Sequence, residues 1–317
     1  MGKNKVKGIT ALLLVSVLLF GLCSCKSKDE EEPTTLAETT AAYYEVTEAN
    51  EVTVPATEQT VQPSKQTVTE APVTEAAEEP VSEEAEITGT KTVTEGNKTI
   101  VYPAALEGSQ RTYPVIAWAN GTACPTNLYI KLIEAIANGG YIVIADSTTM
   151  SGDGTAQIDS LNFMLNKNAD SSGIFYNKVD TSALGVCGQS QGGRSCINAA
   201  QKDSRIRCVV SIAGASSADE SRGLNTPCLF LTGTSDNIVV SSQWCQPSYD
   251  AVTGRAAYAS LIGGNHLAFM NNTAQIAEYT LDWFDAYLKN NADARAVFYN
   301  GGKLANDSAW QDFQNKN

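Results

Sequence analysis

The sequence of 317 residues contains a single histidine, and charged side chains make up only 18% of it. The formal net charge is −13, so the clustered lysines and arginines that recognise phosphate backbones are lacking. No spacing of cysteine, histidine and carboxylate residues resembles a zinc site, and no G-x-x-x-x-G-K-[ST] loop occurs. We therefore expect neither a nucleic-acid partner nor a bound metal.

The chain also lacks an apolar run long enough to cross a bilayer. Its N-terminal apolar run, residues 9–22, falls short of the roughly 20 residues that a spanning helix needs. Three lysines precede it, which is typical of a secretory signal peptide over residues 1–25. The run ends in Leu22-Cys23-Ser24-Cys25, which resembles the lipobox of bacterial lipoproteins. This resemblance implies that Cys25 is diacylated and anchors an extracytoplasmic protein to the membrane; an ordinary cleaved signal or an uncleaved anchor is the alternative.

Residues 26–86 contain no glycine and no apolar periodicity. They hold eleven threonines, five of the ten prolines, 16 acidic residues and 3 basic ones, so the acidity of the chain belongs to this segment. Such a composition predicts a disordered, self-repelling linker, which would reach on the order of 200 Å when fully extended. An acidic recruitment tail is the alternative.

Residues 87–317 predict one α/β domain, because apolar strands alternate with helical segments. Strands that are apolar throughout indicate a mostly parallel central sheet with helices on both faces. An initial hairpin is expected over 88–94 and 98–102. The further strands are expected at 113–119, 141–145, 183–187, 207–212, 228–232 and 257–261, and the helices at 125–137, 156–166, 190–201, 242–252 and 273–288.

A G-x-S-x-G pattern, Gly188-Gln189-Ser190-Gln191-Gly192, directly follows one of these strands and opens a helix. This strand–turn–helix context is the one that a nucleophile elbow requires, with glycines where a Cβ would clash. Ser190 is therefore the candidate nucleophile. An ordinary Gly-rich loop between strand and helix is the alternative.

A serine nucleophile needs a base, and His266 is the only histidine available. It lies in a Gly-rich loop after the strand at 257–261. Asp236, after the preceding strand, is the candidate that orients the imidazole and stabilises its protonated form. Asp219 and Glu220 are the nearest rivals of Asp236.

A developing oxyanion needs two backbone N–H donors. We expect these from Gln191, directly after the nucleophile, and from Thr122, in the turn after the strand at 113–119. The candidate substrate contacts are Gln189, Trp118 and Trp244, although a tryptophan more often serves only in packing.

The ordered motifs look like the α/β-hydrolase superfamily. Within it they resemble the dienelactone-hydrolase-like branch that holds the bacterial cutinases and poly(ethylene terephthalate) hydrolases. The motifs are Gly121-Thr122, Gly188–Gly193, Gly233–Asp236 and Gly264–His266. The resemblance implies hydrolysis of carboxylic esters through an acyl-enzyme and without a cofactor, by Ser190, Asp236 and His266.

The chain departs from this branch at several positions. Its polyesterases typically carry an aromatic residue or histidine before the serine and methionine after it, whereas both are glutamine here. Their aromatic clamp would fall near Ala215, and Gly233 and Ala268 stand where they carry a cysteine pair. These departures favour ester hydrolysis in general over a polyester specialisation.

Six cysteines follow the lipobox, and their pairing is left open by the sequence, since a secreted protein permits disulfides. Those in predicted core strands could equally be buried thiols. The six are Cys124, Cys187, Cys196, Cys208, Cys228 and Cys245.

The sequence thus predicts a tethered, monomeric, extracytoplasmic serine carboxylic-ester hydrolase. Acylated polysaccharide, acylglycerols and polyester are the candidate substrates. A serine peptidase on the same fold and a non-catalytic surface-binding protein are the alternatives.

Overall fold

The computed structural model describes residues 89–317. The predicted signal peptide (1–25), its lipidated Cys25 and the linker (26–86) lie outside the described residues. Within residues 89–317, no helix combines the length and the apolar character that crossing a bilayer requires.

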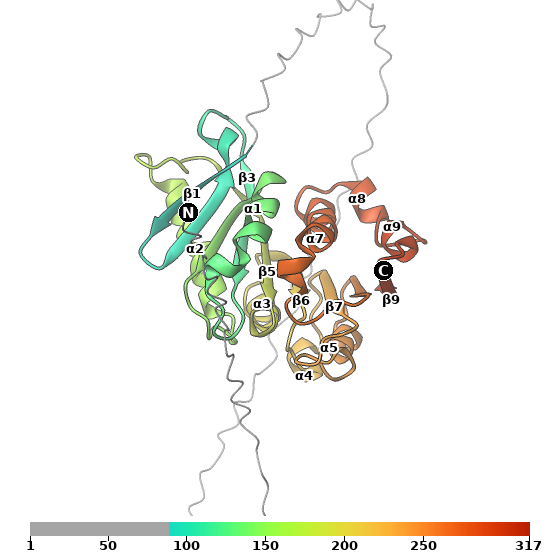
Figure 1. The fold of residues 1–317 in the computed structure, drawn as a ribbon. Helices are drawn as coiled ribbons and strands as arrows, with labels where there is room; N and C mark the ends of the chain where they lie inside the picture. The colour runs from blue at the N-terminus through green and yellow to red at the C-terminus, as the bar shows by residue number, and fades with distance from the viewer. Residues whose placement is uncertain (1–88) are drawn as a thin grey trace, which may run out of the picture. The chain divides into compact units, whose positions relative to one another are not determined.

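The described chain forms a nine-stranded sheet in the order β1-β2-β4-β3-β5-β6-β7-β8-β9 (Figure 1). The six strands from β4 to β8 in this order run parallel, whereas β1, β2 and β9 pair antiparallel at the two edges. The predicted α/β-hydrolase fold class is confirmed. The bounds are β1 (Thr90–Glu95), β2 (Lys98–Pro103), β3 (Tyr113–Ala119), β4 (Ile142–Asp146), β5 (Val179–Gln189), β6 (Ile206–Ile212), β7 (Cys228–Gly233), β8 (Ala256–Leu261) and β9 (Trp310–Lys316).

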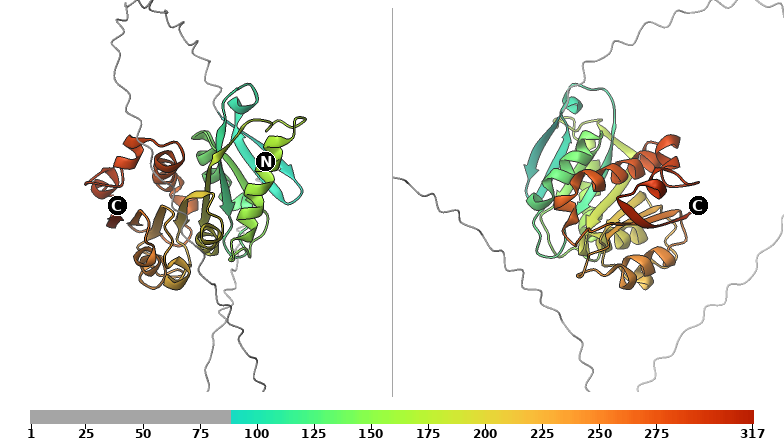
Figure 2. Two further views of the ribbon diagram at one scale, coloured as in Figure 1. Left: turned by 180° about the vertical axis from the view of Figure 1, so that it is seen from behind. Right: turned by 45° about the vertical axis from the view of Figure 1, so that its right-hand side comes forward.

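Helices cover both faces of the sheet, which explains why every residue of β4, β7 and β8 is buried. One apolar core lies under α1 and α7, which run side by side (Figure 2), and the other lies under α2, α3 and α5. These helices are α1 (Ile130–Asn138), α2 (Thr155–Ala169), α3 (Gln191–Lys202), α5 (Cys245–Ala251) and α7 (Thr273–Leu288). The described chain also contains four shorter α-helices, α4 (Ala218–Ser221), α6 (Ala268–Asn271), α8 (Ala292–Ala296) and α9 (Lys303–Asn306), and the 3-10 helices η1 (Ala104–Glu107) and η3 (Ser241–Gln243).

Two expectations are corrected here. The sequence predicted no strand after 257–261, whereas the structure adds β9 at the edge of the sheet, so β8, which precedes His266, is only the last parallel strand. The helix expected over 125–137 begins as a 3-10 turn, Thr126–Tyr129, and this turn leaves Leu128 exposed.

The sheet order reverses between β3 and β5. From β3 the chain crosses to β4 on one side, whereas β5 adds on the other side. In parallel sheets, ligands bind in the crevice beyond the carboxyl ends of strands at such a switch point. Ser190 follows β5 and Thr122 follows β3, so both lie at this crevice.

Candidate active site

Ser190 occupies a sharp turn between β5 and α3, with φ 59° and ψ −123°. A positive φ is uncommon for a residue with a side chain and is sustained only where the surrounding structure enforces it. The flanking glycines meet this requirement. A Cβ on Gly192 would lie 2.0 Å from the carbonyl oxygen of Ala119, and one on Gly188 would lie 2.5 Å from that of Gly192. The turn therefore requires both glycines.

The three residues predicted as a triad lie within hydrogen-bond distance of one another. His266 Nε2 is 3.0 Å from Ser190 Oγ, and His266 Nδ1 is 2.8 Å from Asp236 Oδ2. The imidazole is 11% exposed and the Asp236 side chain is fully buried. The contacts have the geometry of a nucleophile, a base and an orienting carboxylate. The catalytic roles themselves stay a prediction.

The surroundings of Asp236 fix the tautomer of His266. Oδ1 of Asp236 accepts the backbone N–H groups of Ile238 and Val239, each at 2.9 Å. Its other oxygen faces Nδ1 of His266, which therefore carries the proton. The lone pair of Nε2 is then directed at the hydroxyl of Ser190, the arrangement that a general base needs.

The loops that carry Asp236 and His266 are joined through their backbones. The N–H of Thr234 donates to the carbonyl of Leu261 at 3.0 Å. The N–H of Ser235 donates to the carbonyl of Gly264 at 2.9 Å. This close approach depends on a glycine, because a Cβ at position 233 would lie 2.1 Å from the oxygen of Gly264. Backbone hydrogen bonds thus join the two loops where the resembling polyesterases carry a cysteine pair.

The two backbone N–H groups expected to bind the oxyanion have no hydrogen-bond acceptor among residues 89–317, as such a site requires. One belongs to Gln191, the first residue of α3, where the helix dipole also favours negative charge. The other belongs to Thr122, in a turn whose next residue, Ala123, has a φ of 56°. Both therefore keep the predicted capacity to bind an oxyanion.

The structure corrects the expectation for two of the three candidate substrate contacts. Trp118 is 0% exposed and donates its indole N–H to Asn120 at 3.1 Å. Gln189 is 1% exposed, and its amide contacts His266 instead of the cleft. Both lie in interior strands that are covered on both faces, so neither side chain can contact a substrate here. Trp244, 37% exposed at the start of α5, remains a candidate.

The two rivals of Asp236 have structural partners instead. Asp219 is exposed and pairs with Arg222 at 2.7 Å. Glu220 caps α4 through Ser217 and pairs with Arg194 of α3 at 2.6 Å. Burial raises the pKa of Glu220, but hydrogen bonds from Ser217 and Arg194 hold it below its usual value overall.

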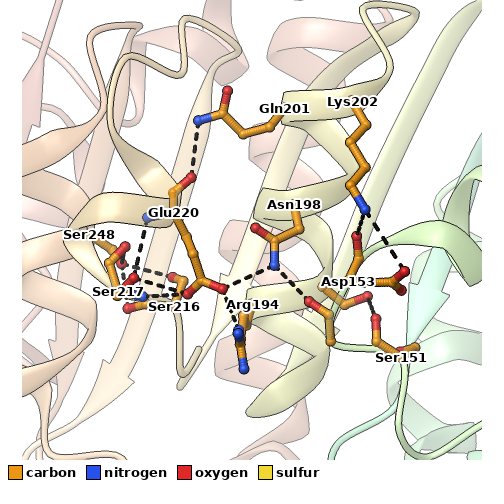
Figure 3. A network of polar contacts seen from close by, with 12 residues as sticks. Ser151, Asp153, Arg194, Asn198, Gln201, Lys202, Ser216, Ser217, Glu220 and Ser248 are labelled. Atoms are coloured by element: carbon orange, nitrogen blue, oxygen red, sulfur yellow. Dashed lines mark hydrogen bonds and ion pairs between the residues drawn. The ribbon is translucent and has the colours of Figure 1, made fainter. Parts of the chain in front are cut away.

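Glu220 belongs to a polar network that supports the nucleophile helix (Figure 3). Asn198 of α3 donates to Glu220 at 3.2 Å and to the carbonyl of Gly152 at 2.7 Å. The segment between β6 and α4 is held in this way against α3. Within it, the N–H of Ala215 donates to the carbonyl of Ser190 at 3.1 Å. The network therefore fixes the wall beside the nucleophile, a contribution that the sequence did not reveal.

Seven of the nine exposed large apolar side chains among residues 89–317 lie in the connections that follow β3, β4, β7 and β8. These loops lie at the carboxyl edge of the sheet, as Ser190 does. We call this set the apolar rim. Its members are Leu128, Met150, Ile238, Trp244, Ile262, Leu267 and Met270.

The six cysteines within the described residues are all unpaired. Five are buried and Cys124 is partly exposed. Burial raises the pKa of Cys245 to about 12, so its thiol keeps its proton. Among residues 89–317, no group of three or more histidine, cysteine or acidic side chains is placed to hold a metal ion.

Comparison with known proteins places these features in a family. A family described as PET hydrolase-like matches residues 58–313. Cutinase est2 of Thermobifida alba is 27% identical over 203 residues, covering 61% of this chain and 64% of that protein. Cutinase 1 of Thermobifida cellulosilytica is 24% identical over 199 residues, covering 62% and 74%. A bis(hydroxyethyl) terephthalate hydrolase of Streptomyces coelicolor is 22% identical over 200 residues, covering 61% and 62%. The chain thus spans less than two thirds of the length of the first and last of these relatives.

Proposed function

The chain belongs to the PET hydrolase-like family, and from this premise we propose that it is a serine carboxylic-ester hydrolase. The observation that carries the proposal is the pair of contacts joining Ser190, His266 and Asp236 at 3.0 and 2.8 Å. A binding protein without catalytic activity has no need of a strained serine aligned with a tautomer-fixed imidazole.

In the proposed reaction, Ser190 Oγ attacks the ester carbonyl while His266 Nε2 takes the hydroxyl proton. The backbone N–H groups of Gln191 and Thr122 hold the oxyanion of the tetrahedral intermediate. His266 returns the proton to the departing alcohol, which leaves Ser190 acylated. Water, deprotonated by His266, then attacks the acyl group, and the acid departs as the Ser190 hydroxyl is restored.

The substrate class that we propose is an ester with an apolar acyl or aryl group. The apolar rim supports this, because it offers exposed apolar side chains at the same edge of the sheet as the nucleophile. The relatives are named for cutin and for a terephthalate ester. The alanine at position 215 supplies no aromatic clamp, so acylated polysaccharide and acylglycerols remain candidates beside polyester.

An extracytoplasmic location completes the proposal, with Cys25 as the lipid anchor and residues 26–86 as a tether. Mass spectrometry of the mature N-terminal peptide tests the anchor. We expect an acylated Cys25 and membrane release of the Cys25→Ala variant. An unmodified N-terminus with the same distribution would overturn the anchor without affecting the ester hydrolase.

The activity is tested with a fluorophosphonate probe and p-nitrophenyl esters. We expect stoichiometric labelling and hydrolysis by the wild type, both lost in Ser190→Ala. Ser204→Ala is the matched control, because Ser204 is exposed beyond α3 and far from the crevice. The substrate class is tested with acetyl and hexanoyl esters, bis(hydroxyethyl) terephthalate and acetylated xylan. Labelling that persists in Ser190→Ala would refute the assignment.

A further inference from the structure

The side chain of Gln189 is engaged at both ends inside the protein. Its Oε1 accepts the hydroxyl proton of Tyr129 at 2.9 Å. Its Nε2 donates to the backbone carbonyl of His266 at 3.0 Å and lies 3.3 Å from His266 Nε2. With 1% exposure, Gln189 touches the base while it is hidden from the cleft.

A neighbouring backbone group fixes which way this amide points. The N–H of Gly121 donates to the hydroxyl oxygen of Tyr129 at 3.0 Å, so the Tyr129 proton is free to point at Gln189. Burial raises the pKa of Tyr129, and the hydroxyl therefore keeps that proton. Since Oε1 of Gln189 must accept it, the NH₂ group of the amide faces His266.

Tight packing holds Tyr129 and Gln189 in these positions. Tyr129 is 1% exposed, and its ring stacks on Phe269 of α6 with centroids 4.5 Å apart. The loop after β3 lies equally close to the side chains of Gln189 and Tyr129. A Cβ on Gly121 would lie 2.6 Å from Gln189 Oε1 and 2.8 Å from the hydroxyl of Tyr129. A continuous chain of contacts thus runs from the loop of Thr122 to the loop of His266.

We propose that Gln189 is a positioning residue that holds His266 in line with Ser190. This rests on the proposed ester hydrolase activity. The bond to the carbonyl of His266 anchors the backbone that carries the base. The amide nitrogen also lies 3.3 Å from His266 Nε2, beside the ring edge that faces Ser190, and so limits the positions open to the imidazole. Through Tyr129, the position of the base is coupled to the loop that supplies an oxyanion donor.

Kinetics of two variants test this role. Gln189→Met keeps a similar volume but has no strong donor or acceptor, and we expect kcat to fall about 10- to 100-fold with KM changed less than about twofold. Tyr129→Phe keeps the ring stack and frees the amide to turn, so a smaller fall in kcat is expected. Gln157→Met is the matched control: Gln157 is also 1% exposed, but it bonds to Ser195. We expect it to lower the melting temperature and to leave kcat unchanged.

The single histidine supplies a spectroscopic readout that does not depend on activity. With isotope-labelled histidine, the imidazole of His266 gives one set of NMR resonances. We expect the Nδ1–H signal, which reports the bond to Asp236, to shift or broaden in Gln189→Met and to keep its wild-type position in Gln157→Met. A residue that serves only the packing of the core would not produce this difference.

The outcomes separate the two proposals. An active wild type with a Gln189→Met variant of unchanged kcat and imidazole spectrum would overturn the positioning role alone. A wild type that neither hydrolyses esters nor labels would overturn the proposed function, while the imidazole spectra would still report on Gln189. If Gln189→Met fails to fold, the same comparison is made with Tyr129→Phe, and unchanged kcat and spectrum there overturn the role.

Discussion

Replacing Asp236 with asparagine tests the tautomer argument directly. In the structure, one carboxylate oxygen of Asp236 accepts two backbone N–H groups, those of Ile238 and Val239. An asparagine would keep these two hydrogen bonds only by placing its own oxygen there. Its NH₂ group must then face His266 Nδ1 at the 2.8 Å contact. Two donors cannot share that contact, so the imidazole is driven to carry its proton on Nε2 and cannot accept the proton of Ser190.

The expected effect is on catalysis and not on folding. We expect kcat on p-nitrophenyl esters to fall about 10⁴-fold, which corresponds to about 5 kcal/mol of transition-state stabilisation. The melting temperature should change little, because the two backbone hydrogen bonds and the side-chain volume are retained. Fluorophosphonate labelling should slow by a similar factor, since it uses the same activated serine.

The matched control is Asp219→Asn, which makes the same change at the nearest rival carboxylate. Asp219 is exposed and bonded to Arg222, so we expect wild-type kinetics from this variant. An Asp236→Asn enzyme within about tenfold of the wild type would refute the reasoning. So would a large loss of activity in Asp219→Asn.

Three further predictions concern stability. A Cβ at Gly233 would lie 2.1 Å from the backbone oxygen of Gly264, in the loop that carries His266. Gly233→Ala, or a cysteine pair engineered at 233 and 268, should therefore lower the free energy of unfolding in urea by about 1–3 kcal/mol; an unchanged free energy would contradict the close approach. Lys98 forms a 2.6 Å ion pair with Asp146, and both side chains are under 10% exposed. Lys98→Met should cost about 3–5 kcal/mol of unfolding free energy, because the carboxylate would be left buried without its cation; a loss below about 1 kcal/mol would contradict this. The side chain of Arg205 holds the pKa of Asp203 below its usual value, so the stability that Asp203 contributes is present above about pH 4 and is lost as the pH falls through its folded pKa. Asp203→Asn should therefore lower the melting temperature at pH 7 and converge with the wild type in acid; a constant difference would contradict the linkage.

The groups that the sequence located well are those that follow a strand. Ser190, Asp236 and His266 each come soon after an apolar run and within three residues of a glycine, where the carboxyl ends of parallel strands meet at one edge. Strand patterning is local, so these positions could be inferred without knowing any contact. The same reasoning recovered α7 with its bounds unchanged, Thr273–Leu288.

What the sequence could not supply depends on partners far along the chain. Gln189 lies 60 positions from Tyr129 and 77 from His266, and nothing in its neighbourhood indicates that its side chain turns away from the cleft. Trp118 was misjudged for a different reason: an aromatic residue inside an interior strand is covered by helices whichever face it points to. Strand β9 was not predicted because its sequence shows no clear apolar alternation, and Trp310 is its only buried residue.

The loops that carry Asp236 and His266 are held together by a close approach of their backbones, which is possible because position 233 is a glycine. Backbone hydrogen bonds between these two loops then fix the positions of Asp236 and His266. Backbone hydrogen bonds therefore hold the loops of Asp236 and His266 together without a disulfide bond between them. It follows that its activity should survive reducing conditions, with the described cysteines free. Activity on p-nitrophenyl esters that falls on treatment with a reductant would show that this inference is wrong.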